Sequence, residues 1–437
     1  MSESRRNQGT RCTVQLMVMV VLVCGLLCAA AGAAETVLRV LTYPRAWYAP
    51  YVEENIPIFE AAYPGVKVSL EKPANLRDRV VTEFAGGVSS DVILVGSIID
   101  NIWRDVLAQD ITRDLRPFVE RDGQFGLKDF FPALVEAFTH GDKLVGIPTE
   151  STTAATFINK TLFDEAGLAY PGKAWDWQDA LKMAKLLTKD FDDDGVPDQW
   201  GFSADGYALH YLGASPFLWA NGADIVDATQ TKATLLEPAA QEALEFFTDL
   251  HFTHRVSVPP GLEEQCYLFW RGEIAIWESA SWNISYNRQK AEPHVDWDIA
   301  YPIVSPRTGQ PAPLVSGHVA TISSTSTNPD LAWELIKFLF VSDAGQKGVA
   351  AQGMLPSRTA FGRYFVQTFE APPQNLEPVL YAASIGRSPV WFKDPQVHRD
   401  VWGIIDTEWN AVMSERQSVR AFAEKVTPLV NNRLQGQ

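Results

Sequence analysis

Aromatic side chains recur in three short stretches, two of which also carry carboxylate or amide groups: Trp47 and Tyr48, Trp219 with Asn221, and Trp277, Glu278 and Trp282 in the run WESASWN. A flat aromatic face packs against the C–H face of a sugar ring, and neighbouring polar groups bind its hydroxyls through directional hydrogen bonds. These stretches therefore indicate a binding site for a polyol such as a sugar. For each single tryptophan, packing in a core or between lobes is the competing interpretation.

The run DFDDDGVPDQW contains groups that could hold a metal ion. Its candidate oxygen ligands are the carboxylates of Asp190, Asp192, Asp194 and Asp198 and the main-chain carbonyl of Val196. Alternating carboxylates in a tight loop suit a hard cation such as calcium, but Gly201 stands where a calcium loop would place its bidentate glutamate. The run is therefore either a structural calcium site or a solvated acidic turn. No other cofactor is required.

Sequence signatures of common enzymes are missing. The chain contains no GxSxG, HExxH, GxxxxGK[ST] or GxGxxG pattern. His251 and His254 are three positions apart, but no third metal ligand accompanies them. Two carboxylates suffice for a glycoside hydrolase, and the chain has 53 acidic residues. A secreted carbohydrate-active enzyme therefore remains the alternative to a protein that binds without catalysis.

The residues around these stretches alternate between strand and helix patterns. Residues 37–43 and 91–95 are short apolar runs, which are typical of strands covered on both faces. Between them, residues 51–62 carry apolar side chains at helical spacing. Such βαβ repeats predict a parallel sheet with helices on both sides. Amphipathic patterns at 175–187 and 237–250 continue the alternation, so we expect a second α/β lobe.

The N-terminus has the features of an export signal. Arginines precede an apolar run at 14–27, and small residues follow at 31–33, so residues 1–34 are predicted to be a signal peptide. An uncleaved membrane anchor or a lipid anchor is the alternative. Either arrangement would place the bulk of the chain outside the cytoplasm.

Composition argues against two classes of protein. Cys266 is the one cysteine outside the predicted signal peptide, so an internal disulfide scaffold is excluded. The formal net charge is −16, from 37 basic and 53 acidic residues. Such a charge repels phosphate groups, so we expect no nucleic-acid partner.

Seven motifs follow one another between residues 37 and 360. In chain order they are YPGVKVSLE, DVILVGS, GDKLVGIPTESTTAATFINKTLFDEAGL, AWDWQDALKMAKLL, DFDDDGVPDQWGF, LFWRGEIAIWESASW and NPDLAWELIKFLFVSDAGQ. In this order they resemble the extracellular solute-binding proteins of bacterial ABC importers, specifically the large sugar-binding class that includes maltose-binding protein.

The resemblance implies a class II periplasmic binding protein fold. It consists of two doubly wound α/β lobes, joined by two or three crossovers, that close on a ligand like a clamp. Lobe one would comprise residues 35–150 and 305–345, and lobe two residues 151–304 and 346–437.

The resemblance also implies which residues contact the ligand in the cleft between the lobes. They are Trp47 and Tyr48 after the first strand, Glu150 and Ser151 at the first crossover, Trp219 in the pocket wall, Trp277, Glu278 and Trp282 in one segment, and Gly317 and His318 at the second crossover. Ile276 replaces the methionine usual in the family, and His318 stands where the family tends to have glycine or an aromatic residue.

The function that the resemblance implies is a periplasmic, monomeric substrate-binding protein of an ABC transporter. It would capture a sugar and deliver it to a membrane permease, without catalysis. A carbohydrate-active enzyme and a binding protein for a glycerol-phosphate-type ligand, a polyamine or a peptide are the alternatives. An anionic ligand would require basic residues, and only Arg45 and Arg271 lie near the aromatic stretches.

Overall fold

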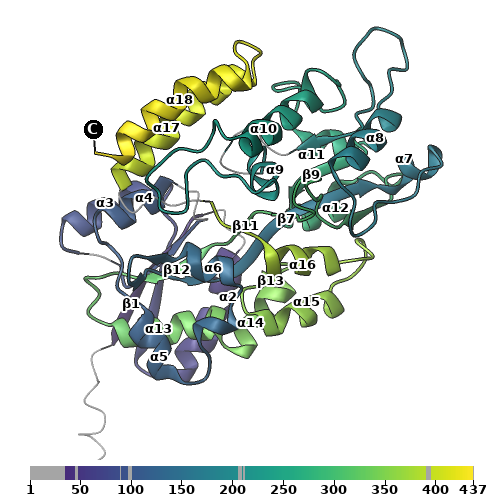
Figure 1. Cartoon of the computed structure of the whole chain (residues 1–437). Coiled ribbons are helices and arrows are strands. Elements are labelled where there is room, and N and C mark those ends of the chain that lie inside the picture. The colour runs from purple at the N-terminus through teal and green to yellow at the C-terminus, as the bar shows by residue number, and fades with distance from the viewer. Residues whose placement is uncertain are drawn as a thin grey trace, which may run out of the picture.

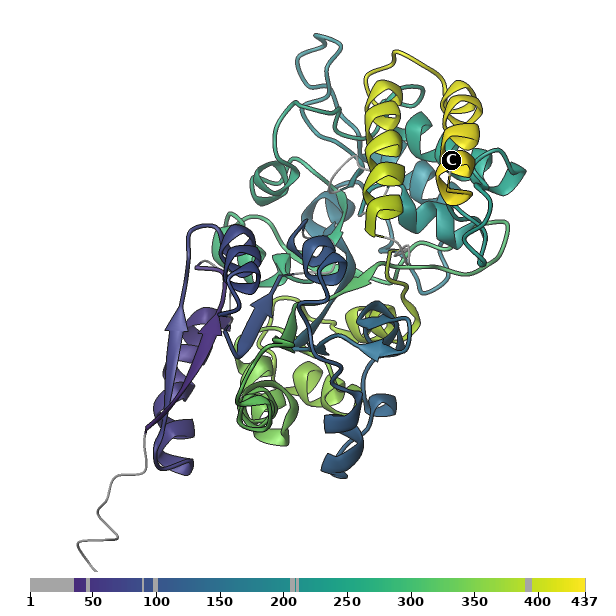
Figure 2. The ribbon, with the colours of Figure 1, turned by 90° about the vertical axis from the view of Figure 1, so that its left-hand side faces the viewer.

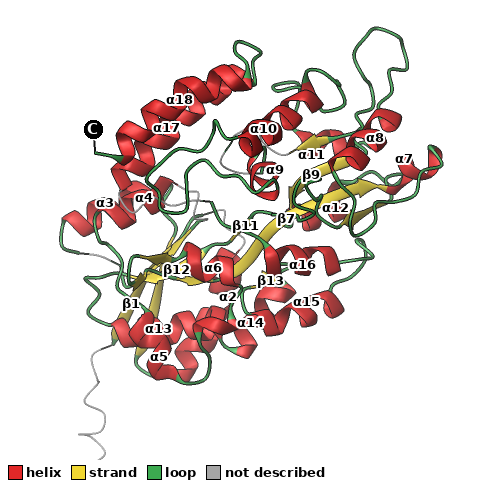
Figure 3. Ribbon diagram, viewed as in Figure 1, coloured by secondary structure: helices red, strands yellow, loops and turns green. Residues whose placement is uncertain are grey.

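A computed structural model describes residues 35–44, 48–88, 90–96, 101–204, 209, 212–389 and 395–436. The predicted signal peptide and Trp47 lie outside these residues. None of the helices in these ranges combines the length and the apolar character that a bilayer span requires. The strands form two main groups, seen in yellow in Figure 3.

The first sheet has the strand order β2-β1-β3-β12-β6. Its strands are β1 (Thr36–Leu41), β2 (Val66–Glu71), β3 (Val92–Val95), β6 (Ile147–Pro148) and β12 (Val319–Ile322). β1 is parallel to β2 and β3, whereas β12 is antiparallel to β3 and β6. The predicted parallel βαβ core is therefore confirmed, and a later part of the chain adds one antiparallel strand to it.

Helices cover both faces of the first sheet. Successive side chains of a strand point to opposite faces, so one strand contributes to the apolar cluster on each side. Val92 and Leu94 of β3 belong to an apolar cluster with α2, α5 and α13, whereas Ile93 and Val95 belong to a second cluster with α3 and α4. The elements of this part are α2 (Tyr48–Ala62), α3 (Leu76–Ala85), α4 (Asn101–Ala108), α5 (Arg116–Asp122), the 3-10 helix η1 (Leu127–Asp129), α6 (Pro132–Ala137), the hairpin of β4 (Thr139–His140) and β5 (Lys143–Leu144), α13 (Pro329–Ile336), the π-helix η2 (Lys337–Val341) and α14 (Asp343–Ala351).

The second sheet is built around β7 (Glu150–Asn159), whose ten residues are all buried. Its path is β10-β7-β9-β8, and β11 and β13 also pair with β7. These partners are β8 (Ser203–Ala204), β9 (Ile276–Ala280), β10 (Trp297–Ala300), β11 (Val315–Ser316) and β13 (Leu355–Pro356). β9 and β10 are antiparallel to β7, whereas β8 is parallel to β9.

The second sheet is also covered on both faces. Ile158 and Ile276 belong to an apolar cluster with α8, α10, α17 and α18, whereas Phe157 and Trp277 belong to a cluster with α11 and α16. The helices of this part are α7 (Lys160–Glu165), α8 (Trp177–Leu187), α9 (Ser215–Ala220), α10 (Pro238–His251), α11 (Gln265–Trp270), α12 (Asn283–Lys290), η3 (Thr359–Phe361), α15 (Gly362–Thr368), α16 (Glu377–Ile385), α17 (Pro395–Val412) and α18 (Val419–Leu434). α17 and α18 lie side by side, and α17 also contacts α4 of the first part (Figures 1 and 2).

The chain passes between the sheets at Thr149, which separates β6 from β7, and again at residues 317–318, between β11 and β12. A third connection runs from α14 to β13. Residues 315–316 pair with β7, so the return to the first part begins after 316 rather than at the predicted 305. Val349 packs in the first part, so this part also extends beyond the predicted 345.

Gly317 is required where the two crossovers meet. A Cβ atom at this position would lie 2.4 Å from the carbonyl oxygen of Glu150 and 3.3 Å from the side chain of Leu134. Because backbone cannot move aside cheaply, we expect Gly317→Ala to lower the free energy of unfolding by about 1–3 kcal/mol in urea titrations. The control is Gly403→Ala in α17, where an added Cβ meets no atom within 4 Å and should stabilise the helix by up to about 1 kcal/mol. Equal effects of the two substitutions would contradict the steric explanation.

Candidate ligand-binding site

β9 sends neighbouring residues of the WESASW segment to opposite faces of the sheet. Trp277 is fully buried, and its ring centre lies 5.3 Å from that of Phe157 and 5.1 Å from that of Phe269. Glu278 points to the other face, where it is the register partner of Thr156. The prediction that Trp277 contacts the ligand is therefore wrong, because its ring belongs to the core.

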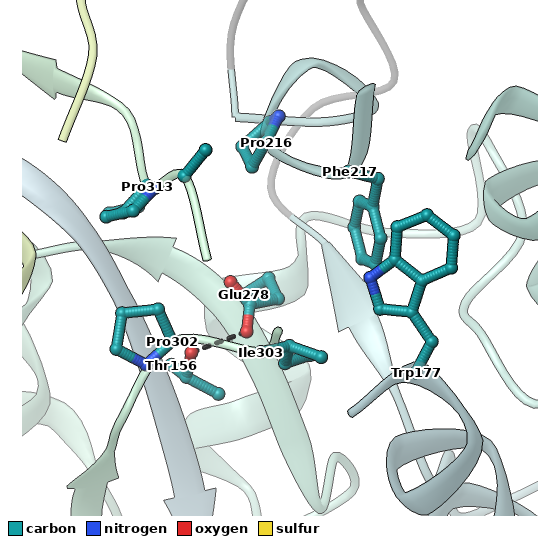
Figure 4. A pocket seen from close by; sticks show the side chains of 10 residues that line it. Thr156, Trp177, Pro216, Phe217, Glu278, Pro302, Ile303 and Pro313 are labelled. Atoms are coloured by element: carbon teal, nitrogen blue, oxygen red, sulfur yellow. Dashed lines mark hydrogen bonds between the residues drawn. The ribbon is translucent and has the colours of Figure 1, made fainter. Parts of the chain in front are cut away.

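Glu278 lies in a small pocket. The hydroxyl of Thr156 donates a hydrogen bond of 2.5 Å to Oε1 of Glu278 (Figure 4). The pocket leaves about 20 Å³ for the centres of water-sized molecules, and it is lined by Ala154, Thr156, Trp177, Pro216, Phe217, Glu278, Pro302, Ile303, Ala312 and Pro313. Burial among these mostly apolar groups raises the pKa of the Glu278 carboxyl to about 7.

Four of the lining residues that matter most for chemistry and shape were not predicted: Thr156, Trp177, Phe217 and Ile303. Two signals could have found the first pair. Thr156 lies in the GDKLVGIPTESTTAATFINKTLFDEAGL motif, in the strand that pairs with the WESASW segment, and Trp177 opens the helix of the AWDW motif after the N-cap Asp176. Phe217 and Ile303 lie in segments with no distinctive pattern.

Trp219 and Trp282 are brought together. Both pack against a small apolar cluster that includes Ala154 and Leu314, with Ala312 beside it, and Ala154 and Ala312 also line the Glu278 pocket. Trp282, two positions after the end of β9, is half-buried and keeps accessible surface. The predicted position of Trp282 is therefore compatible with a ligand beside the pocket.

Trp219 is more enclosed than predicted. Its side chain is buried, and its Nε1 donates to Asp224 over 3.3 Å. The guanidinium of Arg387 lies 5.2 Å from the ring centre and forms an ion pair of 2.7 Å with the same Asp224. This face of Trp219 is therefore covered by the partly exposed Arg387 guanidinium, which a ligand would have to displace in order to stack on it.

A larger hollow of about 880 Å³ lies between loops and helix ends of the two parts. Residues 136–142 line it from the first part, and the segment from 222 to 237 and residues 387–389 line it from the second. It includes Asp224 and Arg387, which surround Trp219. The segment that carries Trp219 therefore borders both the Glu278 pocket and the space between the two parts.

At the crossovers, Glu150 and His318 bind each other. Oε1 of Glu150 accepts from the main-chain N–H of His318 over 2.8 Å and lies 2.6 Å from its Nδ1, and the hydroxyl of Thr149 donates to Oε2. Burial alone would raise the pKa of the Glu150 carboxyl, but the charge of His318 and these hydrogen bonds outweigh it and hold the pKa below its ordinary value. Glu150 is fully buried, so its predicted contact with a ligand is replaced by a structural one.

The other predicted crossover residues are enclosed as well. Tyr48 is fully buried, with its ring edge-on to His318 at 5.2 Å between centres and its hydroxyl donating to the carbonyl of Leu94 over 3.4 Å. Ser151 is fully buried in β7, and Gly317 lies against the backbone of Glu150. The prediction of direct ligand contacts is therefore wrong for Tyr48 and Ser151 and unsupported for Gly317. Only His318 retains accessible surface in this group, with 28% of its side chain exposed.

The acidic loop brings three of its predicted ligands together. One carboxylate oxygen from each of Asp190, Asp192 and Asp194 lies within 4.8 Å of the others, whereas Asp198 instead accepts from the main-chain N–H of Phe191 over 2.7 Å. Oδ1 of Asp190 is buried and finds no hydrogen-bond partner within the described ranges. Three oxygens and an unsatisfied buried acceptor suit a hard cation, so the calcium site stays a proposal that these three residues fit.

The family model described as bacterial extracellular solute-binding protein matches residues 41–346. A putative binding protein from Brucella abortus (strain 2308) is 26% identical over 344 residues, which cover 76% of this chain and 78% of the relative.

Two solved structures show the same fold. The cyclic alpha-maltosyl-1,6-maltose binding protein from Arthrobacter globiformis superposes with a TM-score of 0.76 at 20% identity, over 92% of this chain and 100% of that one. A substrate-binding protein of an ABC transporter from Listeria monocytogenes, solved in complex with cycloalternan, gives a TM-score of 0.74 at 20% identity, over 92% and 98%. These similarities confirm the predicted fold class.

Calcium provides a test of the acidic loop. We expect about 1 mM calcium to raise the melting temperature by about 1–3 °C, because an ion that binds only the folded chain stabilises it. Asp192→Asn should abolish the shift. Asp193→Asn removes the same charge from the same loop but lies outside the carboxylate cluster, so it should preserve the shift. A shift that is equally small in all three chains would identify a solvated turn.

Proposed function

Because the chain belongs to the family of bacterial extracellular solute-binding proteins, we propose that it captures a sugar between its two lobes and delivers it to the permease of an ABC transporter. The predicted signal peptide supports a periplasmic location. The protein from Arthrobacter globiformis binds cyclic alpha-maltosyl-1,6-maltose, and the one from Listeria monocytogenes was solved in complex with cycloalternan, which supports a carbohydrate as the class of ligand.

The observation that carries the proposal is the pocket that contains the Glu278 carboxyl, beside the half-buried Trp282. Ala154 and Ala312 belong to both the pocket and the surroundings of Trp282. An aromatic face next to a hydrogen-bonding carboxyl is the combination that a sugar requires. No basic residue lines the pocket within the described ranges, which disfavours a glycerol-phosphate-type ligand.

Binding without catalysis agrees with the composition of this pocket. A glycosidase places two carboxyl groups across the bond that it cleaves. Among the described residues that line the pocket, Glu278 is the single acid, and the buried Glu150 is already bound to His318. The ligand would instead stabilise the closed state, and a shift from mostly open to mostly closed requires about 5 kcal/mol of differential binding.

A thermal-shift screen over mono-, di- and trisaccharides tests the proposal. A sugar that binds only the folded chain raises its melting temperature. Each sugar that does so is then incubated with the protein and examined for products. Binding without turnover supports a carrier. Turnover would support the carbohydrate-active enzyme, and the absence of any shift would contradict both.

Trp282→Ala should weaken binding of the sugar by ten-fold or more, about 1.4 kcal/mol, because it removes the aromatic face beside the pocket. Titration calorimetry measures the change. The matched control is Trp270→Ala, since Trp270 is also half-buried but lies in α11 and donates to Asn287 over 2.7 Å. Unchanged affinity in the Trp282 variant would remove this residue from the site.

A further inference from the structure

Two polar atoms that face the Glu278 pocket have no partner in the described part of the chain. Thr156 satisfies only Oε1 of Glu278, and Figure 4 shows the second oxygen pointing into the space between Pro216 and Pro313. The indole nitrogen of Trp177 lies on the ring edge that faces the same space (Figure 4). The pocket therefore presents one carboxyl and one N–H donor to an occupant.

Trp177 is held firmly in this orientation. Its side chain is 2% exposed, and its ring stacks on Phe246 with centres 4.8 Å apart and an interplanar angle of 13°. Phe217 packs against it at 5.8 Å. The N–H makes no hydrogen bond within the described residues, so it offers the pocket a donor in a fixed position, and an acceptor there would gain a hydrogen bond.

The size of the pocket limits the occupant to one small group. About 20 Å³ for the centres of water-sized molecules accommodates a single water or a group of that size. The remaining walls are aliphatic, proline and aromatic groups. A sugar ring does not fit inside, but one of its hydroxyl groups does.

The Glu278 carboxyl and the Trp177 N–H together favour a hydroxyl over other small groups. A hydroxyl accepts a hydrogen bond from the Trp177 N–H and donates one to the Glu278 carboxylate. An ammonium group has no acceptor for the indole, and an anion is repelled by the ionised form of the carboxyl. Because the pKa of Glu278 is raised to about 7, the carboxyl is available in both forms near neutral pH, and a hydroxyl can pair with either form.

We propose that Glu278, Thr156 and Trp177 form a hydroxyl-binding subsite that takes one hydroxyl of a neutral polyol, while the rest of the ligand stays outside, beside Trp282. The inference rests on the proposed function and refines it. It assigns the ligand to neutral sugars rather than to amino sugars or sugar phosphates.

The test removes one hydroxyl from the ligand and one donor from the protein. The probe is whichever of glucose, maltose and trehalose binds most tightly, together with its analogues that each lack a single hydroxyl. In the unsubstituted chain, one analogue should bind at least about ten-fold more weakly because the subsite loses its occupant. The variants Trp177→Phe and Glu278→Leu should bind the parent sugar more weakly than the unsubstituted chain does. They should bind the same analogue nearly as well as its parent.

Trp270→Phe is the matched control, because it removes an indole donor that binds Asn287 outside the pocket. It should leave unchanged the analogue ratio, which is the dissociation constant of each analogue divided by that of the parent sugar. Melting temperatures and near-ultraviolet circular dichroism report whether each variant is folded, and if Glu278→Leu does not fold, Trp177→Phe alone decides.

If a sugar binds but all chains show the same analogue ratios, the subsite is overturned while the proposed function stands. A further probe carries an amino group in place of the hydroxyl whose loss weakens binding most. If this amino analogue binds more tightly than its parent sugar, the hydroxyl assignment is overturned. If none of the three sugars binds, the proposed function fails together with the subsite.

Discussion

The contact between the two crossovers is the constraint on which the arrangement of the sheets depends. The Glu150 carboxylate receives three contacts from the crossover residues, two of them from His318, and the absence of a side chain at Gly317 lets the two backbones approach. One carboxylate therefore joins the strand that leaves the first sheet to the segment that returns to it. Because Glu150 is fully buried, removal of the His318 side chain would leave a poorly compensated charge in the interior, which is costly.

The alternation of strand and helix, and with it the two-lobe fold, could be predicted from the sequence, because short apolar runs and helical periodicity are local properties. The limits of the lobes were less accurate. Residues 315–316 pair with Thr152 and Thr153 of β7, and no local pattern shows which of two sheets a short strand joins.

The candidate site was predicted only in part. Glu278 and Trp282, which stay predictions as ligand contacts, could be proposed from the sequence because a carboxyl and a tryptophan stand close together in one segment. Closeness in sequence groups Trp277 with these residues, but the two-residue period of a strand places its side chain on the face opposite to that of Glu278. Glu150 carries the same chemistry as a ligand-binding carboxylate, and only the position of His318 in space shows that it is already bound.

One consequence of the architecture concerns the order of events as the chain is made. β7 is buried along its whole length, yet its partners come from much later in the sequence: Thr156 and Glu278 are separated by 122 positions. Contacts of such long range are slow to form, since loop closure must precede their stabilising effect. A growing chain therefore leaves this strand, with its Glu, Ser, Thr and Asn side chains, without its neighbour until β9 has been synthesised, and the second sheet cannot form before then.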